Sequence, residues 1–195
     1  MRNRHVTHPR RRQYGFSLFE VLVSIVVLSI GLLGLAGLQL TALQNTRDSA
    51  LQSAAVRFGA ELAELMRDNK DIAQKPGGAD NPYLTSFNGT LPAASQDCFT
   101  TSCSDKLAVA RWGIRDWLGR VAQGLPGAVV TVCYDSSPFD SDGLPRWACS
   151  HSGGVAMVKI GWTRRVTDSS KTGLDAFDAA SRPSVVLPIT AGAGV

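Results

Sequence analysis

Residues 15–38 read GFSLFEVLVSIVVLSIGLLGLAGL, and Glu20 is the lone charged residue among them. Only small residues such as serine, alanine and glycine interrupt the apolar side chains after it. As a helix rising about 1.5 Å per residue, residues 16–38 would reach roughly 35 Å. That length covers the hydrocarbon core of a bilayer, so the sequence predicts a membrane-spanning helix over residues 16–38.

The charges around this stretch indicate its orientation. Five arginines precede it, whereas the first charges after it, Arg47 and Asp48, cancel. The 195-residue chain has a net charge of +4, but without residues 1–15 it has 15 basic and 16 acidic residues. We therefore expect a cytoplasmic amino terminus, a periplasmic remainder and no broad basic surface for nucleic acid. The five arginines are Arg2, Arg4, Arg10, Arg11 and Arg12.

The place where such a chain is cut decides what remains of it. An ordinary secretory signal peptide has a basic head and an apolar run that ends in small residues of the A-x-A kind. Residues 38–42 (LQLTA) are a poor site of that kind. The alternative is cleavage between Gly15 and Phe16, which leaves the apolar helix on the product. Glycine before the scissile bond gives a protease an unhindered backbone.

The motif of residues 15–20 and the apolar run after it resemble the prepilin signal of type IV pilins and type II secretion pseudopilins. The resemblance implies that a prepilin peptidase cuts between Gly15 and Phe16 and methylates the new amino terminus on Phe16. In that family the free amino group of a neighbouring subunit pairs with the carboxylate at the position of Glu20, which implies a role in subunit assembly. The alternative for Glu20 is an interfacial carboxylate that reaches the headgroups.

A lone carboxylate in an apolar helix is itself informative. It costs about 2.5–3.5 kcal/mol at the centre of a bilayer and less near its edge. Such a residue is usually functional and usually has a partner. Glu20 is therefore a candidate functional residue on physical grounds alone.

The helix is expected to continue beyond the membrane, because no proline occurs between Phe16 and Asn69 and an apolar stripe recurs at three- and four-residue steps. This predicts one helix over residues 16–69 whose second half packs on a globular head. Gly31, Gly34 and Gly37 permit either close helix packing or local melting, and both remain open. The stripe consists of Leu40, Leu43, Leu51, Ala54, Phe58, Leu62 and Leu65.

The remaining residues, 70–195, are predicted to form that head. Residues 70–96 are rich in proline, glycine, asparagine and serine and favour a long loop. Residues 104–123 have a helical apolar face, with Asp105 suited to the first turn. Residues 128–134, 155–163 and 184–190 favour strands, and Pro188 marks the last as an edge. The predicted fold is α+β: an antiparallel sheet with the long helix and a short one on its face, similar to the lollipop of pilins.

The four cysteines, Cys98, Cys103, Cys133 and Cys149, all lie in the exported segment and favour disulfides. Three connectivities are open, and we prefer Cys98–Cys103 with Cys133–Cys149. A four-cysteine zinc site is the alternative, but the spacings do not resemble paired C-x-x-C knuckles. We expect no metal.

A second resemblance concerns the head. The pattern from Asp97-Cys98 through residues 125–127 (LPG) and 132–134 (VCY) to residues 158–162 (VKIGW) is similar to the minor pilins usually called PilV, the type IV pilus modification proteins. Residues 29–39 share the glycine–leucine cadence of that group. Major pilins usually pair two cysteines near the carboxyl terminus, and the last 46 residues here contain none.

No catalytic or cofactor motif is present in the sequence. His151 is a lone histidine beside two serines, for which a solvated loop position is expected. Residues 135–143 are acidic, but they lack the third carboxylate and distal glutamate of a calcium loop and favour a turn. Trp162, Arg164 and Arg165 could touch an anionic partner, although an aromatic strand residue before a solvated basic turn is favoured.

Together with the sequence observations, the resemblance implies a non-enzymatic minor type IV pilin in the inner membrane that is incorporated into a pilus after processing and acts in pilus assembly. The partners that it implies are the prepilin peptidase, other minor pilins, the major pilin and a tip adhesin. A minor pseudopilin of type II secretion is the nearest alternative. A membrane-tethered periplasmic binding module or enzyme is the second alternative. The expected segments are a leader (1–15), the long helix (16–69) and the head (70–195).

Overall fold

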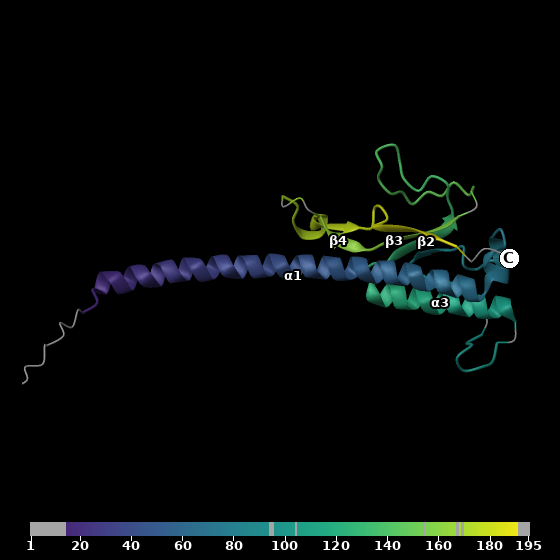
Figure 1. Cartoon of the computed structure of the whole chain (residues 1–195), viewed down its shortest axis with the longest axis horizontal. Helices are drawn as coiled ribbons and strands as arrows, with labels where there is room; N and C mark the ends of the chain where they lie inside the picture. Colours follow the sequence, from purple (N-terminus) through teal and green to yellow (C-terminus); the bar gives the residue numbers. More distant parts are fainter. Residues whose placement is uncertain are drawn as a thin grey trace, which may run out of the picture. The chain divides into compact units, whose positions relative to one another are not determined.

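The computed structural model describes residues 15–93, 96–103, 105–153, 155–166, 168 and 170–190. The arginine-rich residues 1–14 therefore lie outside the described residues, as does Ser104. The chain divides into two units, residues 1–46 and residues 47–195. Figure 1 shows the elements in chain order, which are α1 (Leu18–Asp68), α2 (Lys70–Ala73), η1 (Gly78–Asp80), β1 (Ser86–Asn88), α3 (Lys106–Gly124), β2 (Val129–Tyr134), β3 (Ala156–Gly161), β4 (Thr163–Arg165), η2 (Gly173–Ala176), β5 (Phe177–Ala179) and β6 (Val185–Ile189).

Helix α1 belongs to both units, and its residues have two environments. Every residue from Leu18 to Ala50 is exposed, whereas Ala55, Gly59, Leu62 and Met66 are buried in the second unit. The buried positions recur at steps of four, three and four residues and so line one face of the helix. The long helix predicted over residues 16–69 is thus present, beginning two residues later and ending one residue earlier.

The second unit is built on a four-stranded antiparallel sheet with the strand order β1-β2-β3-β6. In the register, Val130 lies opposite Ile160 and Val132 lies opposite Val158, so these residues share one face. The predicted edge position is confirmed, because β6 with Pro188 is the last strand of this sheet. Strand β1 forms the other edge and falls in a segment that the composition alone had assigned to a loop.

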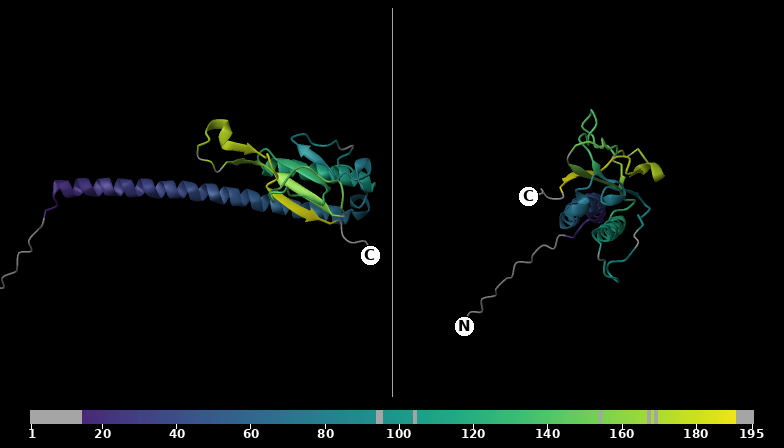
Figure 2. Two further views of the ribbon diagram at one scale, coloured as in Figure 1. Left: turned by 90° about the horizontal axis from the view of Figure 1, so that it is seen from above. Right: turned by 90° about the vertical axis from the view of Figure 1, so that its right-hand side faces the viewer.

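Helices α1 and α3 cover the inner face of the sheet, the face that carries Val130 and Ile160 (Figures 1 and 2). A Cβ added at Gly59 would lie 2.6 Å from the Leu187 side chain, so α1 approaches β6 as closely as glycine allows. Trp117 of α3 is fully buried and donates its indole N–H to the Phe58 carbonyl of α1. The predicted α+β arrangement is therefore confirmed.

Local hydrogen bonds define where the shorter elements begin and end. Asp105 is the N-cap of α3, and its carboxylate accepts hydrogen bonds from the amides of Leu107 and Ala108. Asn81 is fully buried and donates to the carbonyls of Ala73 and Lys75, which fixes the chain after α2. Residues 70–96 were predicted as a loop, but they contain α2, η1 and β1 because side chains such as Asn81 satisfy the turning backbone.

Strands β4 and β5 form a separate two-stranded sheet, in which Arg164 lies opposite Asp178 and Arg165 lies opposite Phe177. This β4–β5 hairpin leaves the main sheet after β3 and returns to it at β6. It therefore stands apart from the four-stranded sheet that holds the core.

Candidate functional site

The predicted processing site lies immediately before α1. Gly15, Phe16 and Ser17 are exposed and precede the first helical residue, Leu18. The carbonyl of Ser17 accepts hydrogen bonds from the amides of Glu20 and Val21, so the helix is established two residues after the predicted scissile bond. A Cβ added at Gly15 would meet no atom within 4 Å. A peptidase could thus reach an accessible, non-helical Gly15–Phe16 bond.

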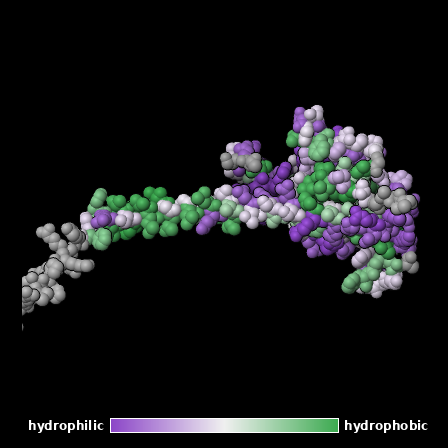
Figure 3. Space-filling model, in the orientation of Figure 1, coloured by the Kyte–Doolittle hydropathy of each residue, from purple (hydrophilic) through white to green (hydrophobic). Residues whose placement is uncertain are grey.

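Apolar side chains surround α1 in the first unit, and none of them is buried. Leu33 is 74% exposed, and this helix is long and apolar enough to cross a membrane. Figure 3 shows the apolar surface over this part of the helix. Exposing so many large apolar side chains to water is unfavourable, so they require lipid or the helices of other subunits.

Glu20 lies at the start of this apolar surface. Its side chain forms no ion pair with any residue that the structure describes, and Ser24 donates its hydroxyl to the Glu20 backbone carbonyl instead. A carboxylate in an apolar environment needs a cation or hydrogen-bond donors. Within the described chain Glu20 has neither, so any such partner must come from elsewhere.

The four cysteines form two disulfides in the second unit. Cys98 is joined to Cys103 and Cys133 is joined to Cys149, which is the pairing preferred from the sequence among three alternatives. The first bond closes a short loop ahead of α3. The second joins the end of β2 to the segment that leads into β3, and so fixes residues 135–149 beside the sheet.

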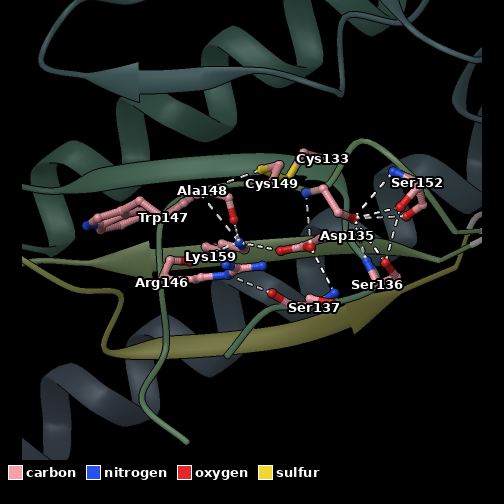
Figure 4. Close-up of polar contacts among 11 residues, drawn as sticks. Cys133, Asp135, Ser136, Ser137, Arg146, Trp147, Ala148, Cys149, Ser152 and Lys159 are labelled. Atoms are coloured by element: carbon pink, nitrogen blue, oxygen red, sulfur yellow. Dashed lines mark hydrogen bonds and ion pairs between the residues drawn. A yellow bond between two sulfur atoms is a disulfide. The ribbon is translucent and has the colours of Figure 1, made fainter. Parts of the chain in front are cut away.

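Lys159 is a fully buried charged residue of the second unit. It lies on β3 opposite Thr131, on the face of the sheet away from the helices, and its side chain is completely buried. Figure 4 shows its ammonium group among the atoms of the segment that the Cys133–Cys149 bond holds. The Lys159 Nζ lies 2.6 Å from the Asp135 carboxylate, and it donates to the carbonyls of Arg146 and Ala148 at 2.9 and 2.7 Å. We call this arrangement the lysine clamp.

The carboxylate of Asp135 completes the clamp. It also accepts hydrogen bonds from the backbone amides of Ser137 and Ser150. Burial raises the pKa of Asp135, but the hydrogen bonds from Lys159 and from these amides outweigh burial and lower the pKa to about 2. The Asp135 carboxyl is therefore ionised at neutral pH, and its ion pair with Lys159 fastens residues 135–150 onto the sheet.

Other candidate residues of this region have structural roles or are exposed. The Sγ atoms of Cys133 and Cys149 and the Asp135 carboxylate lie within 4.8 Å of one another. The two sulfurs are bonded to each other and the carboxylate is bonded to Lys159, so this trio has no free ligand set for a metal ion. His151 is exposed, as expected. In the predicted turn, Asp140 accepts hydrogen bonds from the amides of Asp142 and Leu144.

The lysine clamp was not predicted from the sequence. A lysine within the apolar strand pattern of residues 155–163 was the available signal, because a charge there needs a buried partner. Asp135 was considered only as part of an acidic turn. Its pairing with Lys159 depends on how the segment between β2 and β3 folds back over the sheet.

Comparison with known proteins supports one part of this description. Residues 10–36 match a family described as the prokaryotic N-terminal methylation motif. No curated protein and no solved structure shows a match to the chain. The motif includes Gly15, Phe16 and Glu20, and it supports a type IV pilin-like or pseudopilin protein that is processed by a prepilin peptidase.

Proposed function

We propose that this protein is a minor type IV pilin of the PilV kind, a structural subunit that acts in the initiation and biogenesis of the pilus. In this proposal the prepilin peptidase cuts between Gly15 and Phe16 and methylates Phe16. The chain remains in the inner membrane with its second unit in the periplasm, and is then incorporated into the pilus with other minor pilins and the major pilin. It is not an enzyme.

The observation that carries the proposal is the methylation motif on a helix whose apolar side chains are all exposed from Leu18 to Ala50 and whose Glu20 has no partner in the described chain. Lateral packing against the helices of other subunits would cover the apolar side chains. The amino group created by cleavage of a neighbouring subunit would supply the missing cation for Glu20. Both needs are thus met by one event, assembly after processing.

The decisive experiment is the substitution Gly15→Ala. Because an added Cβ at this position meets no atom within 4 Å, the variant should fold as the wild type does, and any loss of processing reports on the peptidase. We expect Gly15→Ala to retain residues 1–15 in cells that contain the peptidase, as read by mass spectrometry of the amino terminus. Gly34→Ala is the matched control, because an added Cβ meets nothing there either, and it should be processed normally.

Retention of Met1 by the wild-type chain in such cells would overturn the proposal. It would favour the membrane-tethered binding module or enzyme, whose anchor needs no cleavage. Normal processing of Gly15→Ala would remove the assigned role of Gly15.

A minor pseudopilin of type II secretion remains the second candidate, because the methylation motif is shared by pilins and pseudopilins. Deletion of the coding sequence separates the two. Loss of twitching motility with intact exoprotein secretion is expected for the minor pilin, and the reverse phenotype would identify the pseudopilin.

A further inference from the structure

The four asparagines that the structure describes differ in how freely each can react with its own backbone. An asparagine loses its side-chain amide without an enzyme when the backbone amide of the next residue attacks its side-chain carbonyl carbon. This attack needs a following residue with an N–H group and no bulky side chain, an amide that is not held in a hydrogen bond, and an asparagine side chain that can turn. The four residues are Asn45, Asn69, Asn81 and Asn88.

Three of these asparagines are restrained. Asn69 is 9% exposed and donates its side-chain amide to a backbone carbonyl at the start of α3. Asn81 is fully buried, donates to two carbonyls and is followed by Pro82, which has no amide N–H group. Asn45 lies inside α1, and the branched side chain of Thr46 crowds the position after it. None of the three combines a mobile side chain with a free neighbouring amide.

Asn88 is the last residue of β1 and is followed by Gly89, and both residues are exposed. Phe87 is buried on the inner face of the sheet, so strand alternation directs the Asn88 side chain away from the core. This side chain forms no hydrogen bond with any residue that the structure describes. A Cβ added at Gly89 would meet no atom within 4 Å, so nothing crowds the approach of the two groups.

The Gly89 amide lies where the pairing of β1 with β2 stops. The Thr85 carbonyl accepts a hydrogen bond from the Val132 amide at 2.8 Å, and the register places Asn88 opposite Val129. Because hydrogen-bonded and non-hydrogen-bonded pairs alternate, the backbone of Asn88 faces the open edge of the sheet. The Gly89 amide donates to no backbone carbonyl in the described part of the chain. Rotation of this strand end therefore costs little free energy.

The pair Asp142–Gly143 provides a contrast within the same unit. An aspartate before glycine can form the same cyclic product, although more slowly. Here the Gly143 amide donates to the Asp140 carbonyl at 3.1 Å, so the attacking group is held in a turn. The following glycine alone is thus insufficient, and the free amide distinguishes the site at Asn88.

We propose that Asn88 is a site of spontaneous deamidation. The Gly89 amide nitrogen loses its proton to water and bonds to the Asn88 Cγ, and the side-chain nitrogen leaves as ammonia, which closes a cyclic imide. Water then adds to one of the imide carbonyl carbons and opens the ring. The product is aspartate or isoaspartate, and isoaspartate lengthens the main chain by one methylene group. One water is consumed and one ammonia is released, without an oxidant, a metal or an enzyme.

The modification changes the edge of the main sheet. Strand β1 is an edge strand and its residues, Ser86, Phe87 and Asn88, carry no charge. Deamidation adds a carboxylate there, and charged side chains on an edge strand disfavour pairing with a strand of another molecule. This chemistry is independent of the processing and assembly proposed above.

The test uses the full chain in detergent micelles, incubated for days in mildly alkaline buffer and then digested for tandem mass spectrometry. We expect a gain of about 1 Da at Asn88, the difference between the amide and the acid, with isoaspartate identified by electron-transfer fragmentation. Asn88→Gln should remove this gain, because its longer side chain would need a larger ring, and the exposed position should tolerate it. Asn45→Gln is the matched control and should leave the rate at Asn88 unchanged.

A synthetic peptide of residues 86–91 (SFNGTL) measures the rate of an unrestrained Asn–Gly pair. The folded chain should react within about tenfold of this rate, because a strand end opens at little cost. A far slower reaction in the folded chain would overturn the proposal, as would an earlier mass gain at another asparagine. Formation of aspartate without isoaspartate would exclude attack by the Gly89 amide. Isoaspartate at Asp142 to the same extent would show that the free amide does not select the site.

Discussion

Glu20 and Lys159 are both single charges within apolar stretches, but only Lys159 has partners in the described chain. Lys159 is completely buried and is surrounded by the Asp135 carboxylate and backbone carbonyls of its own chain. Glu20 is exposed on α1, and no described residue pairs with it. A buried charge whose partners come from its own fold must keep them, because loss of one partner is strongly destabilising. A charge without a partner in an apolar stretch instead indicates a contact with another molecule.

The largest effect that tests this contrast is expected for Lys159→Met. The variant keeps the volume of the side chain but leaves a buried carboxylate without its cation and the carbonyls of Arg146 and Ala148 without their donor. We expect the free energy of unfolding of the second unit to fall by about 3–5 kcal/mol. Urea unfolding of the full chain in detergent micelles, followed by near-ultraviolet circular dichroism, measures this loss.

Lys106→Met is the matched control, because Lys106 forms an exposed ion pair with Asp71. Its loss should cost at most about 1 kcal/mol. Equal destabilisation by the two substitutions would mean that the lysine clamp does not hold the fold.

The two disulfides should also contribute unequally to the stability of the second unit, with the larger contribution from Cys133–Cys149. Cys133 and Cys149 are separated by 16 residues, and Cys98 and Cys103 by 5. A longer loop loses more entropy on closure. Replacing Cys133 and Cys149 by serine should therefore cost about 3 kcal/mol, and replacing Cys98 and Cys103 should cost about 2 kcal/mol. The same unfolding assay compares the double variants. A larger loss on removing Cys98–Cys103 would contradict the view that the segment over the sheet is the more important constraint.

The next largest effect is expected from acid, which protonates Asp135 and so weakens the lysine clamp. The pKa of Asp135 is about 2 in the folded protein and near 3.9 in an unfolded chain, so the folded state binds fewer protons between these values. The resulting stability, about 2–3 kcal/mol, is fully present above about pH 5 and is lost as the pH falls towards 2. Unfolding measured at a series of pH values should show this decline.

Asp135→Asn isolates the contribution of this carboxyl from that of the other acidic groups. The variant should be less stable at neutral pH and should show a shallower decline between pH 5 and 2. An unchanged slope would show that Asp135 does not carry the acid sensitivity.

The smallest effect on folding is expected for Glu20→Gln, which removes the charge with little change in shape. Since Glu20 has no partner in the described chain, the free energy of unfolding of the second unit should change by less than about 0.5 kcal/mol. Membrane insertion should persist, but incorporation into pili should fall, as measured by immunoblotting of sheared filaments against the membrane pool. Normal incorporation would remove the proposed pairing of Glu20 with a neighbouring amino terminus.

Sequence periodicity predicted the main elements of the second unit because their side chains follow simple repeats. The strands β2, β3 and β6 and the helix α3 lie within two residues of their predicted positions. Strand β1 and helix α2 were missed, because they are held by contacts such as those of Asn81 rather than by a repeat of their own. The β4–β5 hairpin was missed for a similar reason, since its three-residue strands are too short to show alternation.

The candidate functional residues also differ in whether the sequence alone reveals them. The motif at Gly15, Phe16 and Glu20 could be recognised in the sequence, because its residues are neighbours in the chain and a peptidase meets them as a short linear segment. The pairing of Asp135 with Lys159 could not be recognised in this way, because it depends on how the segment between β2 and β3 folds back over the sheet. The basic pair Arg164 and Arg165 was noticed, but only the structure shows that one is paired with Asp178 and the other is not.

The sequence by itself thus determined where the chain can cross a membrane, where it offers itself for cleavage and that it carries a lone acid in an apolar helix. Hydrophobicity and linear motifs act over neighbouring residues, so no fold is needed to recognise them. The tertiary structure alone decided that Lys159 is satisfied from within while Glu20 is not. That distinction depends on which backbone carbonyls and carboxylates arrive around a charge from distant parts of the chain.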